Sequence, residues 1–351
     1  MIDPHYSGFK NKFKLVRKLL SWILPVLIIV LILLSVELVE LRRVLRITKI
    51  NLLLAGLLTQ ILITQIVIQR WRQTIIAAAD LSIPTIVLTK QFYIASAIGH
   101  LVPSSIGLDI YRVIAIGTRY GKYFKNVIAI LIEKISGLIT ISCLIVILYP
   151  FISASFITSD RLLYQVFRVG LMVLVVFLIS IPLFTLFRRQ RMIGVVINYI
   201  ESIANRLLHK IASHVKQNAD ISTHHLSFKD LIEPFNHKGS ALRIISLSFA
   251  IQFTLTIKNF IFFKALGYDI PIIIVLFVVP VLYFIFFLPV SFGGVGVREG
   301  TFIVLYGLFG VPTEIALMVS FFGLLSALTI HLIGGAFLVS NRFSKSSSDR
   351  D

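Results

Sequence analysis

Two arginine residues of this sequence, Arg112 and Arg298, end two segments that fit one pattern, Pro-x-Ser-x-Gly-x-x-x-x-Arg. The first segment is PSSIGLDIYR at residues 103–112, and the second is PVSFGGVGVR at residues 289–298. A guanidinium group offers a planar fork of N–H donors that matches the oxygens of a phosphate or a carboxylate. The chemistry that these arginines favour is therefore the binding of an anion, such as a phosphate headgroup.

Four further charged residues lie in or beside apolar sequence: Asp109, Glu133, Lys134 and Glu299. One charge at the centre of a transmembrane helix costs about 2.5–3.5 kcal/mol on insertion scales, so we do not expect these side chains to face lipid. Pairing of opposite charges around one cavity would lower that cost. Two interpretations remain open: salt bridges with a structural role only, or a substrate-binding site that these residues form with the two arginines.

Both segments interrupt apolar sequence with residues that break helices. Proline lacks a backbone N–H donor, and each glycine costs about 1 kcal/mol relative to alanine inside a helix. Matching broken segments in the two halves of a membrane protein point to the substrate site of a transporter built as an inverted repeat. Groups at the breaks are therefore further candidates for substrate binding: Ser105, Ser291, Gly293, Gly294 and Gly296. We expect the two arginines to converge on one cavity near the bilayer midplane.

The composition indicates an integral membrane protein. Of the 351 residues, 57% are hydrophobic and only 14% are charged, whereas soluble domains contain about 25% charged residues. Several runs reach or approach the roughly 20 apolar residues that span a bilayer, which predicts an all-α polytopic helix bundle. The formal net charge is +18. Because the basic residues cluster in flanks and loops, they favour contact with anionic lipid headgroups at the cytoplasmic face rather than with nucleic acid.

The order of apolar and basic segments predicts a basic cytoplasmic tail (1–18), a transmembrane domain (19–340) and a disordered tail (341–351). Within the domain, the basic and partly amphipathic loop 188–240 is expected in the cytoplasm with both termini, and the membrane is expected to be the cell's inner (plasma) membrane. Spans are expected at residues 19–36, 51–68, 127–149, 164–187, 241–263 and 315–339. Arg70-Trp71-Arg72 is interpreted as an anchor at the level of the headgroups.

The two broken units, residues 83–117 and 272–311, allow two topologies. Six spans with two re-entrant units, inserted from opposite sides of the membrane, place the basic loop in the cytoplasm. Eight full crossings are the alternative, because residues 272–288 are long and apolar enough to span the bilayer.

Signals for catalysis are absent from the sequence, which contains no Walker lysine loop, no H-E-x-x-H and no nucleophile elbow. The single cysteine, Cys143, excludes an intramolecular disulfide and gives no basis for a cysteine-ligated metal. We therefore expect no catalytic residue, no metal and no cofactor.

Four stretches together resemble the transmembrane region of lysylphosphatidylglycerol synthase, also called the flippase-like family. They are R-W-R at 70–72, P-x-x-x-G-x-D-x-x-R from Pro103, an acidic–basic pair followed by glycine at 133–137, and P-V-S-F-G-G-V-G-V-R-E-G at 289–300. The resemblance covers nearly the whole chain. It implies a multi-spanning module that moves or accommodates lipid-linked substrates, such as aminoacylated phosphatidylglycerol or polyprenyl-phosphate sugars. By this match Arg112, Arg298 and Glu299 are the leading site residues, with Asp109 and Glu133 behind them.

The interpretation that we favour is a flippase-like protein that translocates or accommodates an anionic or lipid-linked substrate. One departure from the family pattern is Gly107-Leu108, where the family often has two glycines. The alternative is a membrane-embedded transferase, or a subunit of one, that acts on a lipid-linked donor. A third interpretation is a scaffold whose broken helices only pack. The partners implied are a membrane lipid or lipid-linked substrate and a separate synthase or glycosyltransferase.

Overall fold

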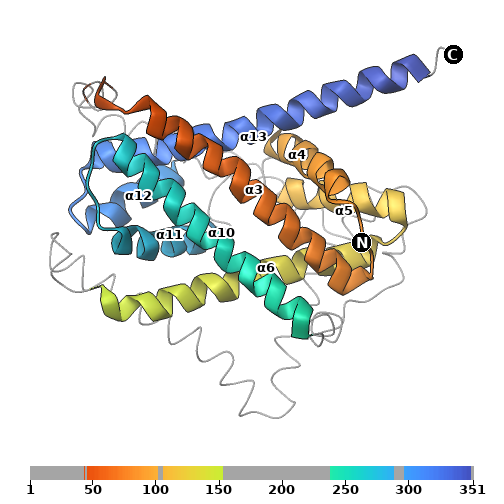
Figure 1. Cartoon of the computed structure of the whole chain (residues 1–351), viewed down its shortest axis with the longest axis horizontal. Helices are drawn as coiled ribbons and strands as arrows, with labels where there is room; N and C mark the ends of the chain where they lie inside the picture. The colour runs from red at the N-terminus through yellow and green to blue at the C-terminus, as the bar shows by residue number, and fades with distance from the viewer. Residues whose placement is uncertain (1–42, 44–45, 102–105, 153–237, 288–295, 349–351) are drawn as a thin grey trace, which may run out of the picture.

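The computed structural model describes residues 43, 46–101, 106–152, 238–287 and 296–348, and all regular secondary structure in this part is helical (Figure 1). The expectation of an all-α bundle is confirmed. Two of the expected spans, 19–36 and 164–187, lie outside the described residues. The tail 1–18 and all but the last three residues of the loop 188–240 lie outside them as well.

In the part of the chain that the structure describes, four helices are long and apolar enough to cross a membrane: α3 (Ile50–Ala79), α6 (Tyr123–Leu148), α10 (Lys238–Ala265) and α13 (Thr313–Ser348). The shortest has 26 residues. At about 1.5 Å per residue it exceeds the roughly 30 Å hydrocarbon core of a bilayer. The helix α13 continues to Ser348, and the disorder that we expected for the tail 341–351 stays a prediction. No proline or glycine follows Gly335 to end this helix earlier.

Four shorter helices occupy the places of the two broken units: α4 (Thr85–Leu101), α5 (Ile106–Tyr120), α11 (Ile272–Phe287) and α12 (Val297–Gly307). The longest has 17 residues, or about 25 Å at 1.5 Å per residue, which is short of the bilayer core. Within each unit the two helices pack on each other, α4 on α5 and α11 on α12. A short 3₁₀ helix, η1 (Tyr149–Phe151), follows α6.

The first short pair, α4 and α5, begins and ends at one end of the bundle. It begins just after α3 and ends just before α6. The Nζ atom of Lys122, at the start of α6, donates a hydrogen bond to the carbonyl oxygen of Ala79, the last residue of α3, at 2.7 Å. The chain therefore leaves the long helix α3 and returns to the long helix α6 at the same end.

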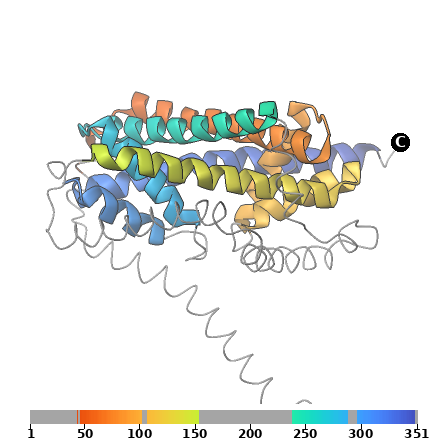
Figure 2. The same ribbon diagram turned by 90° about the horizontal axis from the view of Figure 1, so that it is seen from below.

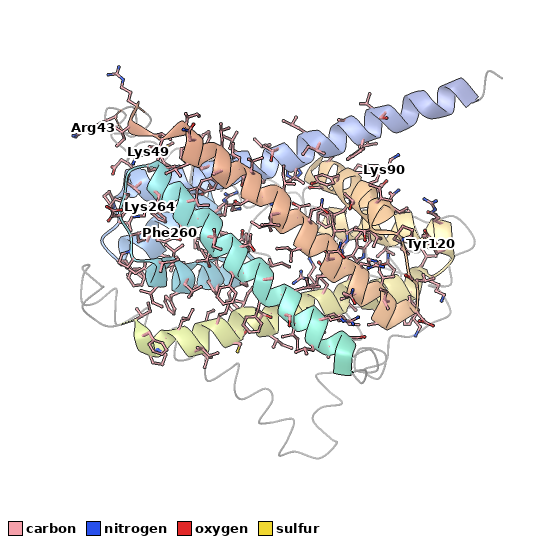
Figure 3. All side chains as sticks on the ribbon, in the orientation of Figure 1. Arg43, Lys49, Lys90, Tyr120, Phe260 and Lys264 are labelled. Carbon is pink, nitrogen blue, oxygen red and sulfur yellow. The ribbon has the colours of Figure 1, made fainter. Side chains whose placement is uncertain are left out.

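The second short pair, α11 and α12, begins and ends at the opposite end of the bundle. The N–H of Lys49, before α3, donates to the carbonyl oxygen of Ala265, the last residue of α10, at 2.8 Å. The hydroxyl of Tyr268, after α10, donates to the carbonyl oxygen of Gly310, before α13, at 3.3 Å. Figure 3 shows Lys49 at the end of the bundle opposite Tyr120. This arrangement favours the re-entrant topology over eight full crossings.

The helices α3 to α6 and α10 to α13 therefore form two units of the same order that enter from opposite ends, as an inverted repeat does. The helices α3 and α10 pack on each other, and each short pair packs on the long helix of the other unit, α4 on α13 and α11 on α6. Figures 1 and 2 both show α11 and α12 at one end of the bundle and α5 at the other. Two clusters of buried apolar side chains form the core, and each contains side chains from helices of both units.

The contact between α4 and α13 depends on Gly334, where a Cβ atom would lie 1.9 Å from the backbone oxygen of Tyr93. We expect Gly334→Ala to lower the free energy of unfolding by about 1–3 kcal/mol, because the two backbones would have to separate. The neighbouring Gly335 is the matched control, since a Cβ atom there meets nothing within 4 Å. Denaturant titration of both variants tests this prediction, and equal stability of the two would contradict it.

Candidate functional site

One carboxylate and two guanidinium groups form a buried cluster in the first repeat. The Nη2 atom of Arg70 lies 3.1 Å from Oε1 of Glu133, and the Nη2 atom of Arg112 lies 2.6 Å from Oε2 of the same carboxylate. Arg112 is 1% exposed and Glu133 is 4% exposed. Because a buried charge is tolerated only when it is paired and hydrogen bonded, each member of this triad depends on the others.

Asp109 and Lys134 extend the cluster toward the surface. The Nη1 atom of Arg112 lies 3.3 Å from Oδ1 of Asp109, and the Nζ atom of Lys134 lies 2.9 Å from Oδ2. The Lys134 side chain is 45% exposed. With Arg70 and Glu133, the cluster contains three cations and two carboxylates, so one positive charge of the cluster is not balanced by a carboxylate.

Aromatic rings and a backbone contact hold Arg112 in this position. Its guanidinium carbon lies 4.2 Å from the centroid of the Trp71 ring and 5.4 Å from that of Phe92. The Nδ2 atom of Asn126 donates to the carbonyl oxygen of Arg112 at 2.9 Å. Trp71 is fully buried, so the interpretation of residues 70–72 as a headgroup anchor is wrong for Arg70 and Trp71. These two side chains point into the bundle, where the buried Glu133 carboxylate needs a second cation.

The second repeat contains two cations at the corresponding depth, Lys258 on α10 and Arg298 on α12. The Nη2 atom of Arg298 donates to the carbonyl oxygen of Ser320 at 2.7 Å. The Nζ atom of Lys258 donates to Oε1 of Gln60 at 2.8 Å, and Lys258 is only 4% exposed. Both cations therefore hydrogen bond to uncharged oxygen atoms.

Glu299 lies next to Arg298 in the sequence but acts as a helix cap. Its Oε2 atom accepts a hydrogen bond from the N–H of Gly296 at 2.5 Å, which closes the first turn of α12. Gly296 has a φ of +84°, a backbone conformation that favours glycine. Within the described residues, no salt bridge joins a carboxylate to Arg298 or to Lys258.

The structure thus separates the predicted site residues into two groups. The first repeat brings together Asp109, Arg112, Glu133 and Lys134, and the second contains Gly296, Arg298 and Glu299. Among the described residues no contact joins Arg112 to Arg298, and the shared cavity that we expected for the two arginines stays a prediction. Ser105, Ser291, Gly293 and Gly294 lie outside the described residues.

Sequence reasoning did not select Arg70 or Lys258 as site residues. Each lies deep inside its long helix, within apolar sequence. A charged residue at that depth is by itself a signal of function. The correspondence of Arg70 and Lys258 becomes visible only when α3 and α10 are aligned as equivalent elements.

A family model described as Lysylphosphatidylglycerol synthase TM region matches residues 21–335 of the chain. The chain belongs to this family. Comparison with curated proteins and with solved structures yields no match. The Lysylphosphatidylglycerol synthase TM region is an integral membrane family of lipid-related function, and the resemblance found in the sequence is confirmed. In this member, one cation cluster contains its own carboxylates and the other does not.

Proposed function

We propose that this chain translocates an anionic or lipid-linked substrate between the two leaflets of the membrane. This substrate is a phospholipid or a polyprenyl-phosphate-linked compound. The observation that supports this function best is the insertion of the two short helix pairs from opposite ends of the bundle. Each pair places an arginine among the long helices. A transporter built in this way can offer an equivalent entry to a substrate from either side of the membrane.

Buried cations are the second support for the proposal. A phosphate headgroup that enters the hydrocarbon region needs partners that replace its water shell, and Arg and Lys side chains supply charge-assisted hydrogen bonds to phosphate oxygens. Arg298 and Lys258 have donors and no carboxylate partner among the described residues. The anion is therefore the part of the lipid that the protein would recognise.

A vesicle assay tests the function directly. The full chain is reconstituted into phosphatidylcholine vesicles that contain a trace of fluorescent phosphatidylglycerol, and a membrane-impermeant reductant bleaches the outer-leaflet probe. We expect the reductant also to bleach the inner-leaflet probe when the protein is present, whereas in empty vesicles this probe stays fluorescent. A soluble dye that stays trapped inside the vesicles shows that they do not leak. If bleaching stops at the outer leaflet, as in empty vesicles, this activity is wrong for phosphatidylglycerol, and a polyprenyl-phosphate probe repeats the test for the second substrate class.

The orientation in the membrane forms part of the proposal. Basic residues near the end of α5 and the start of α6 favour a cytoplasmic position for that end of the bundle, in the inner (plasma) membrane, with both termini on the same side. In a Cys143→Ala background, the exposed positions Arg119 and Asp269 are suitable reporters. We expect Asp269→Cys to react with an impermeant thiol reagent in intact cells and Arg119→Cys to react only after permeabilisation. The reverse pattern would place the bundle the other way round.

A further inference from the structure

The helices α3 and α10 are joined by two reciprocal hydrogen bonds. Arg70 Nη1 donates to Oγ of Ser248 at 3.2 Å, and Lys258 Nζ donates to Oε1 of Gln60 at 2.8 Å. Arg70 follows Gln60 in α3 at the same spacing at which Lys258 follows Ser248 in α10. The two hydrogen bonds are therefore equivalent under the repeat, and Lys258 is the counterpart of Arg70.

The helices α6 and α13 show the same equivalence at Glu133 and Gly323. These two residues follow the first residue of their helix at the same spacing. Ser136 Oγ donates to the carbonyl oxygen of Glu133 at 3.1 Å, and Ser326 Oγ donates to that of Gly323 at 2.7 Å. The first repeat therefore has a carboxylate where the second repeat has a residue without a side chain.

Arg298 occupies the space beside Gly323. A Cβ atom on Gly323 would lie 2.3 Å from the Nη2 atom of Arg298. Each repeat has one cation on its first long helix and one on a short helix. In the first repeat they are Arg70 and Arg112, and both bind Glu133. In the second repeat they are Lys258 and Arg298, and within the described residues neither forms a salt bridge with a carboxylate.

Within the described residues, no carboxylate takes that place through a salt bridge to Lys258 or Arg298. The neighbouring acid, Glu299, caps α12 through Gly296. A further polar group lies beside the cations with no partner of its own: the Oγ atom of Ser320 is buried without a hydrogen bond. Two cations that donate only to uncharged oxygen atoms and an unpartnered hydroxyl are groups that can bind a phosphate through hydrogen bonds.

We propose that a phosphate-bearing headgroup binds between Lys258 and Arg298, at the place that the Glu133 carboxylate occupies in the first repeat. The inference rests on the proposed function and names the part of the protein that recognises the substrate. In the first repeat the cations form salt bridges with the carboxylates of Glu133 and Asp109, so this cluster has a structural role. The second repeat binds the anion, through the fork of Arg298 and the compact ammonium group of Lys258.

The replacement of Gly323 by glutamate tests the inference, because it supplies the missing carboxylate. The full chain in detergent is titrated with fluorescent phosphatidylglycerol. We expect Gly323→Glu to weaken binding about tenfold or more relative to Gly323→Gln, since its carboxylate would pair with the two cations, and a tenfold loss corresponds to one charge-assisted contact. The two side chains have the same size, so both displace Arg298 in the same way. Equal affinity of these two folded variants would overturn the inference.

Lys258→Met provides a second measurement that does not depend on the space beside Gly323. A purely structural lysine predicts a lower melting temperature and unchanged lipid binding. The anion site predicts the opposite: binding about tenfold weaker, with an unchanged or higher melting temperature, because a buried charge that forms no salt bridge is removed. The structural result would overturn the inference.

Inorganic phosphate as a competitor separates a lipid site from a site for free phosphate. Displacement of the lipid by millimolar phosphate in the wild-type protein, and not in Lys258→Met, supports a headgroup site. Phosphate binding without phosphatidylglycerol binding would overturn the headgroup assignment. If the wild-type protein translocates the lipid but Gly323→Glu binds it as well as Gly323→Gln does, the proposed function stands and this site is wrong.

Discussion

Glu133→Gln should lower the free energy of unfolding by about 3–5 kcal/mol, the usual cost of removing one partner from a buried ion pair. The glutamine keeps the shape of the side chain but leaves Arg70 and Arg112 without their shared carboxylate. Arg112 is 1% exposed, so water cannot replace the lost partner. Denaturant titration of the purified chain in mixed micelles measures the effect, with helix content as the signal.

Lys134→Gln is the matched control, because Lys134 is the next residue and its side chain is 45% exposed. Loss of a partly exposed pair with Asp109 should cost at most about 1 kcal/mol. The double variant Arg70→Gln/Glu133→Gln should recover part of the stability lost in Glu133→Gln, because it also removes one unpaired cation. Equal stability of the Glu133 and Lys134 variants would show that the triad is not the structural unit that its contacts indicate.

Arg298→Lys should slow lipid translocation by about tenfold or more, because a lysine keeps the charge but loses the fork that can bind two phosphate oxygens at once. Arg298→Ala should slow it at least as much. Folding should survive both changes, since among the described residues the Arg298 side chain has one hydrogen bond, to the carbonyl oxygen of Ser320, and no salt bridge. The vesicle assay with fluorescent phosphatidylglycerol gives the rates.

Arg119→Lys is the control for this series, because Arg119 is exposed near the end of α5, away from the second repeat. Its rate should equal that of the wild-type protein. A wild-type rate for Arg298→Lys would mean that a point charge is sufficient, and the argument from the forked guanidinium would then be wrong. Melting temperatures of all variants exclude loss of folding as the cause of a slow rate.

The proposed pairing of Arg298 with a lipid rather than with a carboxylate would give the two repeats different roles. A repeat whose charges are satisfied internally can serve as a rigid support, because every change in the Arg70–Glu133–Arg112 triad leaves a buried charge unpaired. A repeat whose cations form no salt bridge can accept and release an anion. Under this proposal, one half of the inverted repeat would provide support and the other would recognise the lipid.

Much of the architecture was determined by the sequence alone. Long apolar runs must form helices in a bilayer, since no water is present to hydrogen bond the backbone, and the four described long helices lie where those runs predicted them. The prolines and glycines near residues 103–107 and 289–296 predicted the two short helix pairs. The repeated Pro-x-Ser-x-Gly-x-x-x-x-Arg pattern predicted an inverted repeat, because two matching breaks in one chain imply two equivalent units.

The partners of the charged side chains were decided only by the tertiary structure. Glu133 binds Arg70, which is 63 residues away, and Lys258 binds Gln60, which is 198 residues away. The packing of α3 on α10 and α6 creates these pairs, and no local pattern encodes that packing. The equivalence of Glu133 and Gly323 is also hidden in the motif alignment. The spacing from the second motif's arginine to Gly323 is about one helical turn longer than the spacing from the first motif's arginine to Glu133. That difference shifts the register, so only the packed helices reveal the missing carboxylate.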